Sequence, residues 1–348
     1  MTSAGGQHVT SSVNAGAAAA ERPPAAGLAA MVKLLRPHQW VKGAFVLVGP
    51  FYGGVLGHIA PATAVACALV SFSLASSLSY IVNDLADVDA DRLHPRKRRR
   101  PIASGAVSMT QAKVLAGVCF VGAAVACLGV ALVPGFITGL VGGGQVGPVA
   151  ARAGGWTAAA WTGAAVGAYL LNTVLYSLVF KHRPIADVLS LAMGFVLRVL
   201  AGCAAASVVP STFLLNCTLF LAMYLAFGKR LGERRTMGNI EDAAKVRAVQ
   251  SQYTDDLLRM LVVVTAVALL VAYTEYVQAM ADKYTVGFNL LWLTVLPAVY
   301  AMLRSIMLLE NGKYDDPTEL AVKDRPFQVA GLLFALITGA AMLVAMKR

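Results

Sequence analysis

Asparagine and aspartate side chains recur every fourth residue directly after a long apolar stretch of this 348-residue chain. Asn83, Asp87 and Asp91 are spaced i, i+4 and i+8, so on a continuing helix they share one face and climb about 6 Å per step. One amide and two carboxylates offer only hard oxygen ligands, which suit Mg²⁺. Because Mg²⁺ usually completes its shell with water and substrate phosphates, the spacing predicts a metal site for a diphosphate substrate.

Two further aspartates, Asp84 and Asp89, bring the acidic cluster to four aspartates within eight residues. The alternative is a solvated loop at the end of a membrane span. Carboxylates this close repel one another unless a cation neutralises them, which favours the metal site. We therefore expect Asn83, Asp87 and Asp91 to ligate Mg²⁺, with Mn²⁺ as a substitute, and Asp84, Asp87 and Asp91 to take part in catalysis.

A run of five consecutive cations, Arg96 to Arg100, follows the acidic cluster and leads into the segment Pro101–Gly105. One interpretation is a topogenic charge run that contacts lipid headgroups. The other is phosphate binding, since arginine supplies planar, bidentate donors to phosphate oxygens. On the second interpretation we expect Arg98 to contact the substrate.

Composition places these motifs in a membrane protein. The chain is 58% apolar and 14% charged, with a mean hydropathy of +0.67, whereas soluble domains carry roughly 25% charged residues. The net charge of +11 does not indicate nucleic-acid binding, because the basic residues lie in short segments between apolar stretches. The many glycines and alanines permit close helix packing within one subunit or in a homo-oligomer.

Nine apolar stretches approach the roughly 20 residues that cross a bilayer as a helix. The first is the weakest, since Pro50 and Gly53-Gly54 interrupt it. Segment 134–155 is glycine-rich and is interpreted as a loop or re-entrant piece. We expect a disordered cytosolic tail over 1–32 and a catalytic membrane domain over 33–348. The predicted spans are 40–57, 62–83, 111–133, 156–180, 185–207, 210–228, 255–279, 286–309 and 327–346.

The distribution of lysine and arginine predicts the orientation. With the N-terminus inside, the cytosolic side and its flanking turns hold 24 of the 29 Lys and Arg residues, and the opposite side holds four. Cytosolic loops carry such an excess. We therefore predict a multi-pass protein of the plasma membrane with a cytosolic N-terminus and active site and an external C-terminus.

The fifth predicted span holds charges that need explaining. Asp187 and Arg198 are 11 residues apart, so they share a helical face with Arg198 about 16 Å deeper. An intramembrane arginine marks either a functional site or a structural ion pair. Tyr176 and Lys181, just before this span, are candidate site residues or ordinary interfacial anchors.

The pattern NDxxDxxxD, followed by the basic run and Pro101-Ile102-Ala103-Ser104-Gly105, resembles the first signature of the UbiA superfamily. The similarity extends from about Leu34 to about residue 345. It implies an all-α bundle of nine transmembrane helices around a cavity that opens to the cytosolic side. It also implies a Mg²⁺-dependent transferase that acts on polyprenyl substrates in the bilayer.

The chain departs from that family after the sixth span, where most members carry a second acidic motif, DxxxD. The corresponding loop instead holds Lys229, Arg230, Glu233 and Arg234. Phosphoribosyl diphosphate together with a polyprenyl monophosphate brings more negative charge than one prenyl diphosphate. Cations in place of the second acidic cluster have the right sign to bind those phosphates directly.

Three segments resemble the decaprenyl-phosphate phosphoribosyltransferase branch: Leu35–Lys42, His94–Gly105 and Tyr176–Arg198. The resemblance implies transfer of 5-phosphoribose to decaprenyl phosphate, which supplies cell-wall arabinan synthesis (arabinogalactan and lipoarabinomannan). Lys181 and Asp187 are then expected to be catalytic. The expected substrate-binding residues are Arg36, Gln39, Lys42, Arg98, Tyr176, Arg198, Lys229, Arg230, Glu233 and Arg234.

Two other functions remain open at this stage. An ordinary UbiA-type transferase of prenyl groups to aromatic or lipid acceptors is disfavoured by the missing DxxxD. A transporter would place its ionisable residues near the membrane midplane at repeat-related positions, whereas nearly all of them here lie at one end of the spans.

Overall fold

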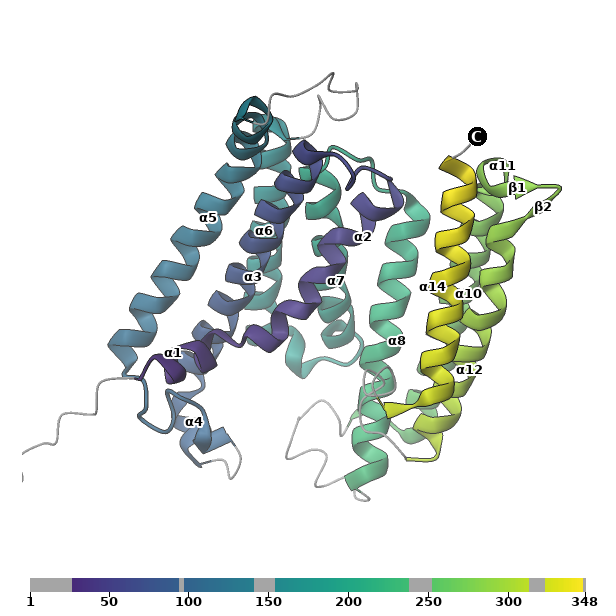
Figure 1. Ribbon diagram of the computed structural model, residues 1–348. Coiled ribbons are helices and arrows are strands. Elements are labelled where there is room, and N and C mark those ends of the chain that lie inside the picture. The colour runs from purple at the N-terminus through teal and green to yellow at the C-terminus, as the bar shows by residue number, and fades with distance from the viewer. Residues whose placement is uncertain (1–26, 94–96, 141–153, 238–251, 313–322, 347–348) are drawn as a thin grey trace, which may run out of the picture.

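The protein is a bundle of long helices (Figure 1). The structure, a computed structural model, describes residues 27–93, 97–140, 154–237, 252–312 and 323–346. The elements in chain order are α1 (Leu28–Leu35), η1 (Pro37–Gly43), α2 (Ala44–Tyr52), α3 (Ile59–Ala86), α4 (Val88–Leu93), η2 (Lys97–Arg99), α5 (Met109–Leu140), α6 (Gly155–Leu178), η3 (Phe180–His182), α7 (Ala186–Ala205), α8 (Thr212–Met237), α10 (Asp255–Ala279), α11 (Ala281–Tyr284), β1 (Thr285–Val286), β2 (Phe288–Asn289), η5 (Leu290–Thr294), α12 (Val295–Glu310) and α14 (Arg325–Met346).

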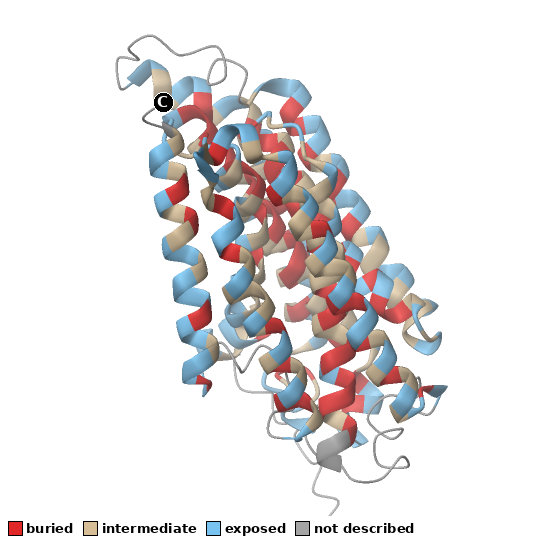
Figure 2. Ribbon diagram, turned by 90° about the vertical axis from the view of Figure 1, so that its right-hand side faces the viewer, coloured by how far each residue is buried: buried red, intermediate tan, exposed pale blue. Residues whose placement is uncertain are grey.

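Eight helices in the described ranges are long and apolar enough to cross a membrane. They correspond to the second through ninth predicted spans, which confirms the all-helical, membrane-spanning class. Large apolar side chains such as Val118, Leu128 and Phe136 lie exposed on their outer faces. Figure 2 shows exposed residues on the outer sides of the helices and buried residues between them. Apolar side chains on the outer faces suit a lipid environment, where their exposure carries no penalty.

The first predicted span, 40–57, is not a single helix. It consists of the seven-residue η1 and the nine-residue α2, which together are shorter than a membrane-spanning helix, so the predicted nine spans are not confirmed. Pro50 removes a backbone donor inside α2, and Gly54 has a left-handed φ of 68°. Figure 1 nevertheless shows this segment rising from the end of the bundle that holds α1 and α4 toward the end where α3 begins. We call the end of the bundle where α1 and α4 lie the motif end.

Two other boundaries differ from prediction. Helix α5 continues to Leu140 with Pro134 inside it, so the predicted loop 134–155 is wrong over 134–140, while 141–153 lies outside the described residues. Neighbouring helices can satisfy the carbonyl that a proline frees in a membrane helix. Likewise α8 runs to Met237, so the Lys229–Arg234 segment is helical and not a loop. Helix α1 begins within the predicted tail 1–32, and residues 1–26 are outside the described residues.

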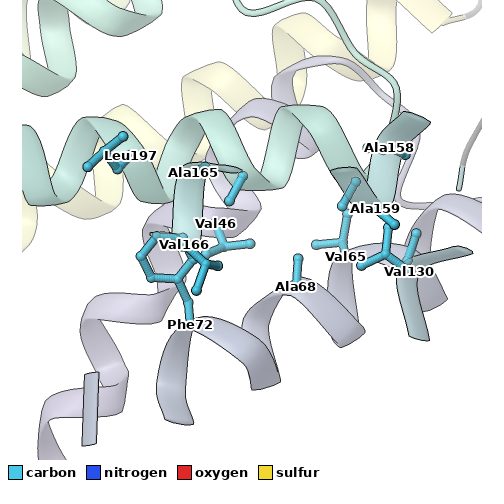
Figure 3. Close-up of a cluster of buried hydrophobic side chains, with 14 of the residues drawn as sticks. Val46, Val65, Ala68, Phe72, Val130, Ala158, Ala159, Ala165, Val166 and Leu197 are labelled. Carbon is cyan, nitrogen blue, oxygen red and sulfur yellow. The ribbon is translucent and has the colours of Figure 1, made fainter. Parts of the chain in front are cut away.

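Small and β-branched side chains fill the main core, which joins α2, α3, α5, α6 and α7 (Figure 3). Its aromatic members Phe72 and Tyr169 pack against each other, with ring centroids 5.1 Å apart, and the other members are aliphatic, among them Ala165 and Ala201. A second core joins α8, α10 and α12 and includes Tyr224, Phe227 and Leu258. Val188 of α7 belongs to this second core, so α7 links both halves of the bundle.

Helices α2 and α7 approach each other closely where Gly202 meets the backbone of Val46. A Cβ atom at Gly202 would lie 1.8 Å from the carbonyl oxygen of Val46, so only glycine fits. We predict that Gly202→Ala lowers the free energy of unfolding by about 1–3 kcal/mol, because the two helices must separate. Thermal unfolding in detergent measures the effect. Gly163→Ala, where nothing lies within 4 Å, is the matched control and should leave the unfolding temperature unchanged or raise it.

Candidate active site

A polar cavity of about 190 Å³ lies between α3, α6 and α7 at the motif end of the bundle. Four predicted site residues line it: Asn83, Lys42, Tyr176 and Arg198. The remaining lining carries mostly hydroxyl and amide groups. These other residues are Ser79, Tyr80, Tyr169, Asn172, Thr173, Ser177, Ser190, Leu191, Gly194 and Phe195.

Asn83 lines this cavity, and Asp87 follows it by one helical turn; we call this end of the cavity its mouth. Asp87 is the C-cap residue of α3, and the Asn83 Nδ2 donates to its carboxylate at 3.2 Å. The Asn83 Oδ1 accepts from the Ser177 hydroxyl at 3.4 Å, which ties α3 to α6. Both side chains are half-buried, and Asn83 is among the residues that line the cavity. This pair fits a Mg²⁺ ion that shares its shell with substrate phosphates, since Mg²⁺ commonly takes only one or two protein carboxylates.

Asp91 does not join Asn83 and Asp87, contrary to the prediction that the three share a face. Helix α3 ends at Ala86, and Asp91, on α4, is buried with its carboxylate 2.7 Å from the Arg100 Nη1. Residues seven apart on a helix differ by about 20°, whereas residues eight apart differ by about 80°. Asp91 therefore shares its face with Asp84. No group of three or more His, Cys, Asp or Glu residues in the described ranges is arranged to hold a metal.

Asp84 lies at the centre of a charge network beside the mouth. Its buried carboxylate accepts two hydrogen bonds from the Arg36 guanidinium, each 2.8 Å, and one from Arg100 at 3.0 Å. Arg100 thus bridges Asp84 and Asp91. The network fixes two guanidinium groups, from different segments, at the same end of the cavity. Asp84 is accordingly a positioning residue for cations.

The N-terminal turn that carries Arg36 is held against α3 by four further contacts. Arg36 ends α1 with a left-handed φ of 53°, and its guanidinium stacks over the Tyr80 ring at 4.7 Å. The Ser77 hydroxyl donates to the Leu35 carbonyl at 2.7 Å and accepts from the Trp40 indole at 3.0 Å. The Tyr80 hydroxyl donates at 3.2 Å to Gln39, another predicted site residue. The N-terminal turn therefore presents Arg36, Gln39 and Lys42 together.

Asp187 is used by a different network. Its carboxylate is fully buried and pairs with the equally buried Arg230 of α8, whose Nε lies 3.1 Å from Oδ2. The other oxygen accepts from the Val188 backbone N–H at 2.8 Å and from the Tyr253 hydroxyl at 3.1 Å. Asp187 is not among the residues that line the polar cavity. The structure therefore separates it from Arg198, with which it was predicted to share a polar face.

Tyr253 holds the turn before α7 in place. Its hydroxyl accepts from the backbone N–H of Ile185, a residue with a left-handed φ of 65°. Burial raises the pKa of Tyr253 to about 12, with the neighbouring Asp187 adding to the rise, so the phenol remains a proton donor at neutral pH. Arg234 bonds the Tyr253 carbonyl and pairs with Asp255 at 2.7 Å. Arg230 and Arg234 thus join α8 to α7 and α10.

The remaining predicted residues lie outside the cavity lining. Arg98 is exposed in η2, and Lys181 is half-buried in η3. Lys229 is exposed and Glu233 half-buried on α8, and both have interaction partners. These four residues add charge to the motif end, but none of them lines the polar cavity.

Three residues with clear roles in this geometry were missed from the sequence. Arg100 bridges two aspartates, Tyr169 contacts Arg198, and Tyr253 anchors Asp187. Arg100 had a signal, since it directly precedes the Pro101–Gly105 segment in the cation run. The tyrosines had none. Tyr169 lies among apolar residues inside a predicted span, and a tyrosine near a span end, such as Tyr253, usually indicates an interfacial anchor.

A second, mostly apolar cavity of about 460 Å³ lies on the other side of α2 and α7. Helices α8, α10 and α14 complete its wall, which includes Tyr273, Tyr276 and Phe334. Phe45 lines this apolar cavity and packs edge-on, at a ring-centroid distance of 4.8 Å, against Phe195, which lines the polar cavity. The arrangement places a polar, cation-lined chamber next to an apolar one.

The model of the UbiA prenyltransferase family matches residues 43–323. The chain belongs to this family. Among curated relatives, the decaprenyl-phosphate phosphoribosyltransferase of Mycolicibacterium smegmatis is 30% identical over 330 residues, or 92% of this chain and 94% of the relative. The protein of the same name from Corynebacterium glutamicum is 30% identical over 90% of this chain and 86% of the relative.

Solved structures share the UbiA fold. A UbiA homologue from Archaeoglobus fulgidus, bound to GPP and Mg²⁺, superposes with a TM-score of 0.58 at 16% identity, covering 91% of this chain and 99% of that one. A digeranylgeranylglyceryl phosphate synthase superposes with a TM-score of 0.54 at 13% identity, covering 92% and 97%. The helical arrangement of the UbiA family is therefore present over nearly the whole chain.

We predict that Asp187→Asn destabilises this UbiA protein by about 3–5 kcal/mol, because Arg230 would stay buried without a counter-charge. Thermal unfolding in detergent is the measurement. The double variant Asp187→Leu with Arg230→Met should recover much of the loss, since neither charge remains. Asp89→Asn, at an exposed side chain that pairs with Arg92 on the protein surface, is the control. Unchanged stability in Asp187→Asn would show that the pair is not structural.

Proposed function

We propose that this chain transfers the 5-phosphoribosyl group of phosphoribosyl diphosphate to a polyprenyl phosphate, namely decaprenyl phosphate. The observation that carries the proposal is the 30% identity, spread over nine-tenths of the chain, to proteins named decaprenyl-phosphate phosphoribosyltransferase. The product, decaprenylphosphoryl-5-phosphoribose, would serve cell-wall arabinan synthesis. On this proposal the chain crosses the plasma membrane nine times, with the motif end cytosolic and the C-terminus outside.

The charges of the site support a substrate pair rich in phosphate. Lys42 and Arg198 line the polar cavity, and Arg36 and Arg100 are fixed beside its mouth. At the end of α8, where most family members carry a second acidic motif, Arg230 and Arg234 are instead used to join helices. One pair of oxygen donors, the Asn83 amide and the Asp87 carboxylate, remains at the cavity mouth. Such a site suits one metal-bound diphosphate together with phosphates that cations bind directly.

The reaction breaks the bond between the anomeric carbon and the diphosphate oxygen and forms a bond from that carbon to an oxygen of the lipid phosphate. A Mg²⁺ ion held by Asn83 and Asp87 would neutralise diphosphate charge and make it a better leaving group. Arg36 and Arg100, held in position by Asp84 and Asp91, donate to the phosphate oxygens as negative charge develops on them. The lipid phosphate is already ionised at neutral pH, so no strong general base is required. Alignment and electrostatics then supply most of the rate.

The two cavities divide the substrates by polarity. The polar cavity offers hydroxyl and amide partners for a ribose, and the apolar cavity offers a surface for the first isoprene units of the lipid. Because the apolar cavity is bounded by α2, α8 and α14, its walls are the outer helices that face the bilayer. The rest of the polyprenyl tail would leave between them.

A substrate swap in nanodiscs tests the proposed function. Decaprenyl phosphate with labelled phosphoribosyl diphosphate and Mg²⁺ should give a lipid-linked phosphoribose and release diphosphate. Decaprenyl diphosphate with 4-hydroxybenzoate should give no product, because the chain lacks the second acidic cluster. The opposite pattern would leave the family assignment intact and remove the phosphoribosyl donor.

Removing the metal tests the role of the cavity mouth. Chelation should abolish turnover, and Mg²⁺ or Mn²⁺ should restore it. Asp87→Asn should lower kcat/KM by about 100-fold or more, since a metal contributes several kcal/mol to charge stabilisation. Asp89→Asn, exposed on the same segment, should remain near wild type. If Asp87→Asn turns over normally with a normal Mg²⁺ requirement, Asp87 is not a ligand.

A further inference from the structure

Arg198 lies at the floor of the polar cavity and is 6% exposed. Its Nη1 donates to the Gly194 carbonyl at 2.6 Å, and its Nη2 donates to the Tyr169 hydroxyl at 3.2 Å. The guanidinium carbon stands 4.6 Å from the Tyr169 ring centre, 5.4 Å from that of Phe72 and 5.5 Å from that of Phe195. Three rings and a carbonyl therefore hold this cation in one place.

No carboxylate in the described ranges forms an ion pair with Arg198. Asp84 and Asp91 are taken by Arg36 and Arg100, and Asp187 is taken by Arg230. A buried cation inside a membrane bundle is costly unless an anion or a polar cavity compensates it. Aromatic rings and one carbonyl orient a guanidinium without neutralising its charge. Among the residues that the structure describes, Arg198 is thus an oriented cation without an anionic partner.

The cavity beside Arg198 is small and is lined by groups that bind a sugar. Ser79, Asn172, Thr173, Ser177 and Ser190 contribute hydroxyl and amide groups to its wall. Asn172 is itself fixed, because its Nδ2 donates to the Ser190 carbonyl at 2.8 Å and its Oδ1 accepts from the Ser190 hydroxyl at 2.9 Å. An anion that reaches the floor would therefore arrive attached to a polyhydroxylated group.

We propose that the floor of the polar cavity is a receptor for a phosphate monoester, the 5-phosphate of the sugar donor, with Arg198 as its cation. This inference rests on the proposed function and deepens it. The donor's diphosphate would lie at Asn83 and Asp87, the ribose along the hydroxyl-lined wall, and the 5-phosphate on Arg198. One molecule then spans the cavity from mouth to floor and meets a matching group at each level.

The lipid acceptor also carries a phosphate monoester, but the structure favours the sugar at this position. The lipid would enter from the apolar cavity, and the rings of Phe45 and Phe195 stand between that cavity and Arg198. The hydroxyl and amide groups of that lining would find no hydrogen-bond partner on an isoprenoid chain. Arg198 would therefore make the enzyme select phosphorylated sugars, since a donor without the 5-phosphate leaves the buried cation unpaired.

The experiment compares phosphoribosyl diphosphate with ribose 1-diphosphate, which lacks only the 5-phosphate. We expect wild-type protein to prefer the phosphorylated donor in kcat/KM by about 100-fold, as one buried charge-assisted contact is worth roughly 1.5–3 kcal/mol. In Arg198→Gln that preference should fall to near one. Arg198→Lys keeps the charge and should retain part of the preference. A purely structural role would lower kcat/KM for both donors equally.

A lipid arm distinguishes the two sources of phosphate. The KM for decaprenyl phosphate should be unchanged in Arg198→Gln, and ribose 5-phosphate should compete with the donor in wild type but not in this variant. A rise confined to the lipid KM, or a donor preference that survives in Arg198→Gln, would overturn the inference.

Two controls protect this conclusion. Tyr169→Phe keeps the ring but removes one hydrogen bond to Arg198, so it should reduce the donor preference less than Arg198→Gln does. Size-exclusion profiles and unfolding temperatures establish that each variant is folded. If wild type does not transfer phosphoribose at all, the proposed function fails. If it transfers phosphoribose and the variants keep the preference, only the Arg198 inference fails.

Discussion

The buried ion pair between Asp187 and Arg230 organises the motif end of the bundle. Both charges are out of contact with water, so each is tolerable only while the other is present. Because Asp187 begins α7 and Arg230 lies near the end of α8, their pairing fixes the relative depth of two helices. Tyr253 adds the start of α10 and braces the left-handed turn at Ile185. The α7 face that forms the cavity is oriented by this pair.

Other charged side chains at the motif end also pair with groups of opposite charge. Asp84 and Asp91 bind Arg36 and Arg100. Two carboxylates of the acidic cluster therefore serve to orient cations. Asn83 and Asp87, whose contacts are with each other and with Ser177, keep oxygen atoms at the cavity mouth. A site that binds several phosphates needs fixed positive groups. The half-buried guanidinium groups of Arg36 and Arg100 are already oriented by buried carboxylates before substrate arrives.

Hydropathy alone located all eight long helices, because a membrane helix needs an apolar run that few other structures require. The predicted helix ends were wrong near prolines, glycines and charged residues. The first span was overestimated because Pro50 and the glycines after it interrupt α2, and α5 and α8 were cut too short because Pro134 and Lys229 resemble stop signals. Those signals are overridden by packing against neighbouring helices.

The candidate site was predictable only where spacing along one helix carries the information. Asn83 and Asp87 followed from their i, i+4 spacing, and Arg198 from its cost inside a membrane. The partners of Asp187 and Arg198 come from other helices, Arg230 on α8 and Tyr169 on α6, so no local pattern could assign them. Asp91 was misplaced because a one-residue change in helical phase moves a side chain by about 100°.

The aromatic wall between the two cavities has a consequence for how the enzyme senses its substrates. On the proposed function, the sugar donor arrives from water, so its occupancy follows a concentration per volume. The lipid arrives from the bilayer, so its occupancy follows its share of the membrane surface. With Phe45 and Phe195 keeping the two routes apart, diluting the membrane with inert phospholipid slows the reaction while the solution concentration of every reactant stays constant. On the proposed function, the rate of this step therefore falls when the share of lipid acceptor in the membrane falls, even if the supply of sugar donor is unchanged.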